Sequence, residues 1–86
     1  MAGHYLAELM KIAAQLEVRV RIERLGDAET PIESGLAWVE GQPILFLDPR
    51  LPELEKVAVA ARELAAFPMD DIYLKPAIRE LLSTSG

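Results

Sequence analysis

The sequence predicts an α+β fold in one domain over residues 1–86: a helix, a three-stranded mainly antiparallel sheet, a core helix and a short C-terminal helix (α-β-β-β-α-α). Three observations support this prediction. Residues 4–16 have the apolar spacing of an amphipathic helix. Residues 17–24 alternate apolar and charged side chains, which is typical of a half-buried strand. Within 43–67, an apolar run leads directly into a second helical pattern.

The spacing of apolar residues changes between the first helix and the first strand. The helix gathers its apolar residues on one face: Tyr5, Leu9, Ile12, Ala13 and Leu16. The strand alternates apolar residues with charged ones: Val18, Val20 and Ile22 with Arg19, Arg21 and Glu23. Turn-forming residues then accumulate, so residues 25–33 are predicted to form a mobile loop.

Two further strands should form an antiparallel hairpin. In residues 35–40, two side chains should point to each face of the sheet: Leu36 and Trp38 to one, Ala37 and Val39 to the other. The short connection 40–43 contains Gly41 and is typical of a tight turn. The run 44–47 is wholly apolar, which predicts a central strand buried on both faces.

The core helix is predicted over residues 52–66, because Pro52 suits a first helical position and Pro68 follows the end. Its buried arc should contain Leu54, Val57, Ala58, Ala61, Leu64 and Ala65. Val59 and Ala66 lie on the opposite, polar arc, which predicts a second contact with the C-terminal segment or with another subunit. The final helix is predicted over 76–82, and the residues after it should fray.

The composition excludes several classes of function. The chain has no cysteine, which excludes disulfides, thiolate nucleophiles and cysteine-ligated metals and favours the cytoplasm. The formal net charge is −5 and the arginines form no basic cluster, so nucleic-acid binding is not expected. No apolar run is long enough to cross a bilayer, and the first residues lack the pattern of a secretory signal. We therefore expect a cytoplasmic protein without membrane or nucleic-acid partners.

Few residues are candidates for metal chemistry. His4 is the single histidine, and its position in a first helical turn favours an exposed structural residue over a metal ligand. Asp70 and Asp71 are the one pair of adjacent acids before the last helix; they could bind a cation, although aspartates also occupy turns freely. With Glu63, these residues make up the candidate metal set. No cofactor and no catalytic residue is predicted.

Aromatic residues suggest a third kind of site. Trp38 and Phe46 on neighbouring strands could line a small-ligand pocket, or they could be core residues. Tyr73 and Arg79 could meet across the last helix, and this contact favours a structural role.

The order of elements resembles the start of the ImmA/IrrE-type zinc metallopeptidases, which are zincin-like enzymes. The resemblance covers residues 6–66. It consists of a helix ending in LAAQLEVRV-like text, a hairpin containing G-x-x-x-x-x-G, a strand ending in Asp-Pro-Arg-Leu-Pro, and then a core helix. In that family the helix carries H-E-x-x-H, whose histidines bind zinc and whose glutamate is the general base. Glu63 matches the glutamate, but Arg62 and Ala66 replace both histidines. The resemblance therefore implies a degenerate core without the zinc site.

The chain also resembles a group of short, uncharacterised bacterial proteins of similar length, which implies no activity. The matching text includes Ser34-Gly35-Leu36, Leu45-Phe46-Leu47-Asp48 and Asp71-Ile72-Tyr73-Leu74. The leading hypothesis is a non-catalytic protein-interaction module that self-associates, as a homodimer, or binds another protein. Its predicted interface contains Val59, Arg62, Ala66 and Tyr73. The alternatives are a metal-dependent or vestigial hydrolase-like domain and a small-ligand binder.

Overall fold

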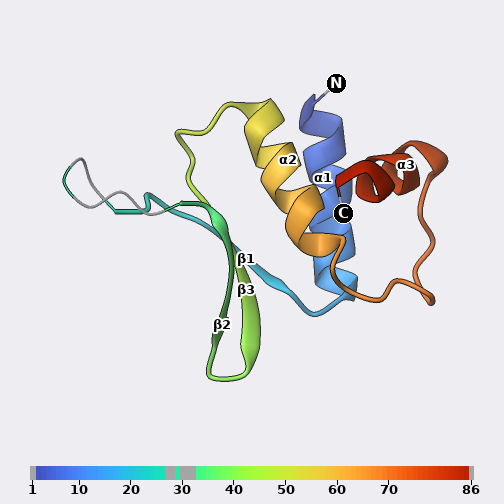
Figure 1. Cartoon of the computed structure of the whole chain (residues 1–86), viewed down its shortest axis with the longest axis horizontal. Helices are drawn as coiled ribbons and strands as arrows, with labels where there is room; N and C mark the ends of the chain where they lie inside the picture. Colours follow the sequence, from blue (N-terminus) through green and yellow to red (C-terminus); the bar gives the residue numbers. More distant parts are fainter. Residues whose placement is uncertain (1, 27–28, 30–32, 86) are drawn as a thin grey trace.

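The computed structural model describes residues 2–26, 29 and 33–85, and within them the predicted order α-β-β-β-α-α is confirmed. Its elements are α1 (Ala2–Gln15), β1 (Arg19–Ile22), β2 (Gly35–Val39), β3 (Gln42–Leu47), α2 (Glu53–Leu64) and α3 (Pro76–Ser85). Most of the loop predicted over 25–33 lies outside the described residues. Figure 1 shows the three helices together on one side of the sheet.

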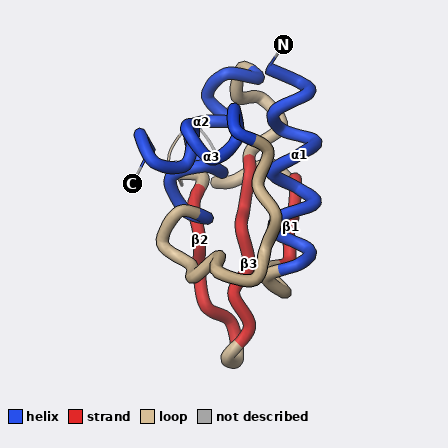
Figure 2. The backbone as a smooth tube through the Cα atoms, turned by 90° about the vertical axis from the view of Figure 1, so that its right-hand side faces the viewer, coloured by secondary structure: helices blue, strands red, loops and turns tan. Residues whose placement is uncertain are grey.

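The sheet has the strand order β1-β3-β2, with β3 in the centre (Figure 2). The predicted antiparallel hairpin of β2 and β3 is confirmed, and its register pairs Ala37 with Ile44. The turn consists of Glu40 and Gly41, whose φ angles of 51° and 79° are both positive, as a two-residue type I′ turn requires. β1 pairs with β3 in the parallel direction, so the sheet is mixed. The apolar run of β3 explains its central position, because a central strand is shielded on both sides.

The core lies between the sheet and the two long helices. Alternation along the strands turns Val20, Leu36, Leu45 and Leu47 towards the helices, where they join the hydrophobic core. The fully buried large side chains are Leu9, Leu45, Leu47 and Leu64. They come from α1, β3 and α2, so these three elements hold the fold together.

The buried face of α2 differs from the predicted one. Its buried residues are Val57, Ala60, Ala61 and Leu64, which follow the spacing i, i+3, i+4, i+7 of a helix packed on one side. Leu54 is 73% exposed, Ala58 is exposed and Ala60 is fully buried, so the prediction was wrong at these three positions. The reason is tertiary: α2 packs against α1 as well as the sheet, and this contact selects the arc that contains Ala60.

The C-terminal helix is longer than predicted. It continues to Ser85, whereas the periodicity predicted an end at residue 82 and fraying beyond it. The hydroxyls of Thr84 and Ser85 donate hydrogen bonds of 3.0 and 2.8 Å to the carbonyl oxygen of Leu81, which holds the last turn. None of the helices in the described part of the chain has the length and hydrophobicity that a membrane span requires.

Candidate functional site

The two outer strands of the sheet differ in how their free edges are protected. Within the described residues, both β1 and β2 pair only with β3. β1 carries two charged residues, Arg19 and Arg21, and charge on an edge strand discourages pairing with another chain. β2 has the sequence Gly-Leu-Ala-Trp-Val and carries no charge. Its Trp38 is 64% exposed and its Val39 is 44% exposed. β2 is therefore the edge that remains open to a further strand.

The C-terminal half of α2 runs beside this open strand. A Cβ atom placed on Gly35 would lie 3.6 Å from Oε1 of Glu63, and the rings of Trp38 and Phe67 stack with centroids 6.4 Å apart. Val59 is half-buried and packs against the hydrophobic core, which differs from its predicted place on the polar arc, whereas Arg62 and Ala66 are exposed. We call β2 together with Val59, Arg62 and Ala66 the edge surface. It contains three of the four residues of the predicted interface.

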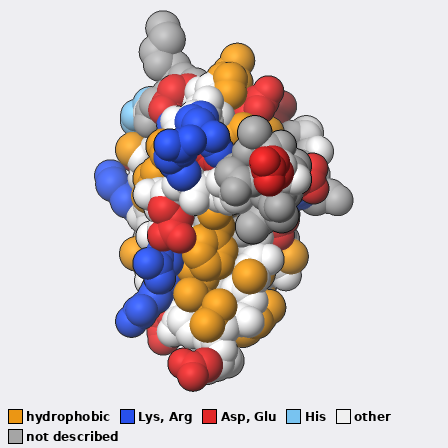
Figure 3. All heavy atoms as spheres, turned by 90° about the vertical axis from the view of Figure 1, so that its left-hand side faces the viewer, with side chains coloured by type: hydrophobic (Ala, Val, Ile, Leu, Met, Phe, Trp, Pro, Cys, Tyr) orange, Lys and Arg blue, Asp and Glu red, His pale blue; other side chains and the backbone are white. Residues whose placement is uncertain are grey.

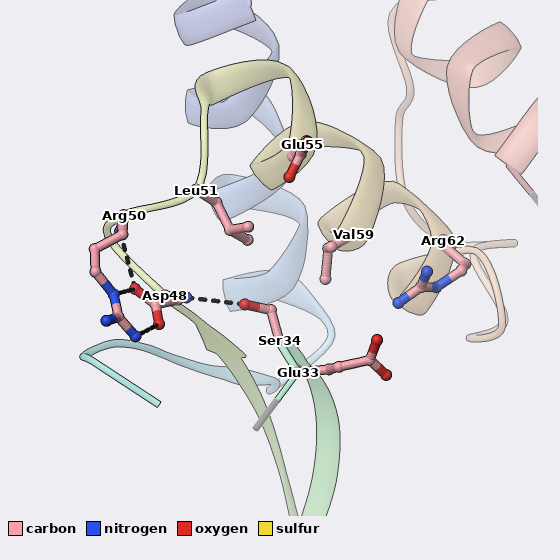
Figure 4. Close-up of a pocket in the computed structure, with 8 residues that line it drawn as sticks. All are labelled: Glu33, Ser34, Asp48, Arg50, Leu51, Glu55, Val59 and Arg62. Atoms are coloured by element: carbon pink, nitrogen blue, oxygen red, sulfur yellow. Dashed lines mark hydrogen bonds and ion pairs between the residues drawn. The ribbon is translucent and has the colours of Figure 1, made fainter. Parts of the chain in front are cut away.

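An open cleft of about 440 Å³ lies at one end of the edge surface. Figure 4 shows Val59 and Arg62 of α2 on one side of it, and Ser34 and Asp48 at the ends of the strands on the other. Glu33, just before β2, also lines the cleft, and its side chain extends from the strand side towards the end of α2 that carries Arg62. The cleft places α2 side chains next to the residue at which β2 begins, so a partner on the edge strand would also meet α2.

The Asp48 carboxylate holds together the segments that form one side of this cleft. It accepts hydrogen bonds from Nε and Nη2 of Arg50 at 2.9 and 2.6 Å, and from the backbone N–H groups of Arg50 and Leu25 at 2.9 and 3.2 Å. The backbone N–H of Asp48 donates to Oγ of Ser34 at 3.0 Å. Asp48 is only 8% exposed. The Arg50 hydrogen bonds hold the pKa of this carboxyl well below its usual range, although burial opposes the shift.

This network makes Asp48 and Arg50 structural residues. Because they neutralise each other, the charges of the cleft left for a partner are those of Glu33, Glu55 and Arg62. Arg62 contacts its neighbour Glu63 through Nη2 and Oε1 at 3.4 Å, in a largely exposed position. Exposed pairs of this kind stabilise a protein little, so the Arg62 guanidinium can exchange its partner readily.

The candidate metal residues do not form one site. His4 is exposed in the first turn of α1, Glu63 faces β2, and Asp70 and Asp71 are exposed in the turn after α2. Among the described residues, no group of three acidic, histidine or cysteine side chains could hold a metal ion. The arrangement therefore supplies no metal chemistry that involves these four residues together.

The candidate aromatic pocket is divided by the sheet. Trp38 pairs with Pro43 and stacks on Phe67 on the helix side, whereas Phe46 pairs with Gly35 and points to the opposite face. On that face Phe46 lines a shallow hollow of about 340 Å³ with Leu25 and Ala37. Figure 3 shows this face as a band of hydrophobic side chains with basic side chains along one margin.

Tyr73 lies apart from the other residues of the predicted interface. It is 78% exposed on the connector before α3, beside a hollow that it lines with Lys11 of α1 and Ile78 of α3. Lys75 of the same connector contacts Glu8 of α1 at 3.1 Å, which holds the connector against α1. Tyr73 and the edge surface thus belong to different sides of the molecule. Within the described residues, no hydrogen bond, ion pair or ring contact joins Tyr73 to Arg79, which is exposed on α3.

Sequence reasoning did not identify Asp48 and Arg50 as a network. The available signal was local, because an aspartate at a strand end followed two residues later by an arginine can form an Asx-type turn. The distant partners, Leu25 and Ser34, have no such signal. No protein-family model, no curated protein and no solved structure matches this chain.

Proposed function

We propose that this chain is a non-catalytic, cytoplasmic protein-interaction module that self-associates through the edge surface. The observation that carries the proposal is the uncharged, exposed strand β2 beside Val59, Arg62 and Ala66. An edge strand offers alternate N–H and C=O groups to a further strand, and natural proteins usually protect such edges when they are not used.

The chemistry of the edge surface suits a protein partner better than a small molecule. A strand that pairs with β2 obtains directional main-chain hydrogen bonds, while Trp38 and Val39 contribute apolar area on the two faces. Arg62 adds one charged group at the margin. Aromatic and arginine side chains are enriched in protein interfaces, which agrees with this combination.

The test is the mass of the protein in solution as a function of its concentration. Light scattering should show two chains of 9.5 kDa each at micromolar concentration and dissociation on dilution. Trp38→Lys places a charge on the open edge and should give a monomer. Tyr73→Lys removes another exposed aromatic residue elsewhere and should leave the dimer intact.

Circular dichroism of both variants verifies that they remain folded. A wild-type chain that is monomeric up to several hundred micromolar would argue decisively against self-association. A dimer that is lost in Tyr73→Lys but kept in Trp38→Lys would move the contact away from the edge surface to the connector.

A further inference from the structure

We infer that the partner on β2 is the β2 strand of a second copy, paired antiparallel about a two-fold axis at Ala37. This inference rests on the proposed function and specifies its geometry. The two three-stranded sheets would then join into one sheet of six strands, in which β1 remains the charged edge on both sides.

The register follows from the composition of β2. Ala37 is the middle residue of the five in this strand, so an axis at Ala37 pairs all five residues with the second copy. Leu36 then lies opposite Trp38 of the partner subunit, which is a favourable aliphatic–aromatic pair. Gly35 lies opposite the partner's Val39. No charged residue occupies any of these positions, so the pairing opposes no like charges although each chain carries a net charge of −5.

The two directions of pairing differ in what they place beside Glu40 at the ends of the ladder. Continuing the register by one residue places the partner's Glu40 opposite Ser34. Ser34 lines the same cleft as Arg62, Glu33 and Glu55, and Arg62 is the group among these three with which the partner's Glu40 could form an ion pair. Glu40 is exposed in the hairpin turn, and the ion pair that Arg62 makes within the described residues is the weak contact with Glu63. By symmetry this pair occurs twice in the dimer. Parallel pairing would instead bring the two copies of Glu40 together.

The residue on the axis is small. Ala37 lies on the axis, and its side chain is on the sheet face that carries Phe46, away from the helices. The small side chain of Ala37 therefore leaves room for the same residue of the second copy on that face.

Single cysteines test the pairing directly, because the natural chain has none. Two copies of residue 37 on the axis would have Cβ atoms about 4.5–5.5 Å apart, close enough for a disulfide with small adjustment. Ala37→Cys should therefore form a covalent dimer rapidly under mild oxidation. Val39→Cys is the matched control on the same strand: its two copies would lie about 14 Å apart in the antiparallel pair and should not cross-link.

Charge reversal tests the predicted contact between the two chains. Arg62→Glu and Glu40→Arg should each weaken dimerisation roughly tenfold, because one attractive pair becomes repulsive at two symmetric places. The double variant Arg62→Glu/Glu40→Arg restores opposite charges and should recover most of the lost affinity. The dissociation constants are measured by sedimentation equilibrium.

The outcomes separate this inference from the proposed function. A wild-type dimer in which Val39→Cys cross-links as fast as Ala37→Cys would overturn the antiparallel register but keep self-association at β2. A dimer in which neither variant cross-links would overturn the register at Ala37, and its persistence in Trp38→Lys would place the contact away from β2. If the losses of affinity in the two single variants simply add in the double variant, Arg62 and Glu40 of the two chains do not contact each other. A protein that stays monomeric would overturn both proposals.

Discussion

Asp48 joins three segments of the backbone near the edge surface. It binds Arg50 and the backbone of Leu25, while its own N–H binds Ser34 just before β2. We expect Asp48→Asn to lower the midpoint of thermal unfolding by roughly 5–10 °C, because an amide cannot accept both charge-assisted bonds of the guanidinium. Lys11→Ala removes only an exposed ion pair with Glu8 and should change the midpoint by no more than about 2 °C.

The same carboxylate predicts a pH dependence of stability. The pKa of Asp48 is lowered in the folded chain, so its contribution is complete above the ordinary aspartate pKa of about 4 and is lost as the pH falls below that value. Between about pH 5 and pH 3, the urea midpoint of the wild type should therefore fall more than that of Asp48→Asn. Lys75 lowers the pKa of Glu8 in both proteins, so that effect cancels. Equal decreases in the two proteins would contradict the assignment.

The hairpin of β2 and β3 depends on the backbone conformation of its turn. Gly41 has a φ of 79° and no atom within 4 Å of the position of a Cβ, so Gly41→Ala would be strained by its backbone alone. We expect Gly41→Ala to lower the free energy of unfolding by about 1–2 kcal/mol. Gly35→Ala is the matched control, because its Cβ would make an ordinary contact with Glu63. A loss as large in Gly35→Ala, measured by urea denaturation, would show that strand packing rather than the turn is responsible.

The packing of α2 on α1 makes a second prediction for an element. Ala60 is fully buried, so Ala60→Leu should overpack this contact and lower the free energy of unfolding by about 1–3 kcal/mol. Ala58→Leu adds the same atoms on the exposed side and should change it by less than about 0.5 kcal/mol. If Ala58→Leu lowered the free energy of unfolding more than Ala60→Leu, the buried arc predicted from periodicity would be the correct one. Urea unfolding curves of the two variants decide between these arcs.

The elements also show how far the sequence predicts this fold. Periodicity located every helix and strand, because the repeats of 3.6 and 2 are local properties. The hairpin followed from a short connection around Gly41. The position of β3 between β1 and β2, and the burial of Ala60 in place of Ala58, depend on contacts between elements far apart in the chain. Periodicity within one segment does not contain this information.

The candidate site was predictable in part for the same reason. Val59 and Ala66 stood out because apolar residues on a polar arc are visible in the sequence. Their neighbour β2 could not be recognised as an open edge until the strand order was known. At the scale of the whole molecule, the edge surface exists because the most apolar strand occupies the centre and leaves an uncharged strand outside. The order of the strands, rather than any motif, creates the surface that we propose for self-association.

Concentration should therefore affect the stability of the whole molecule. A domain of 86 residues buries a modest share of its surface, so an added contact between subunits contributes a noticeable part of its stability. Because association stabilises only the folded chain, the midpoint of thermal unfolding should rise by several degrees between about 1 and 100 μM protein. Trp38→Lys should show a constant midpoint over this range. Differential scanning fluorimetry at matched concentrations measures both, and a wild-type midpoint that does not change with concentration would mean that folding and association are not linked.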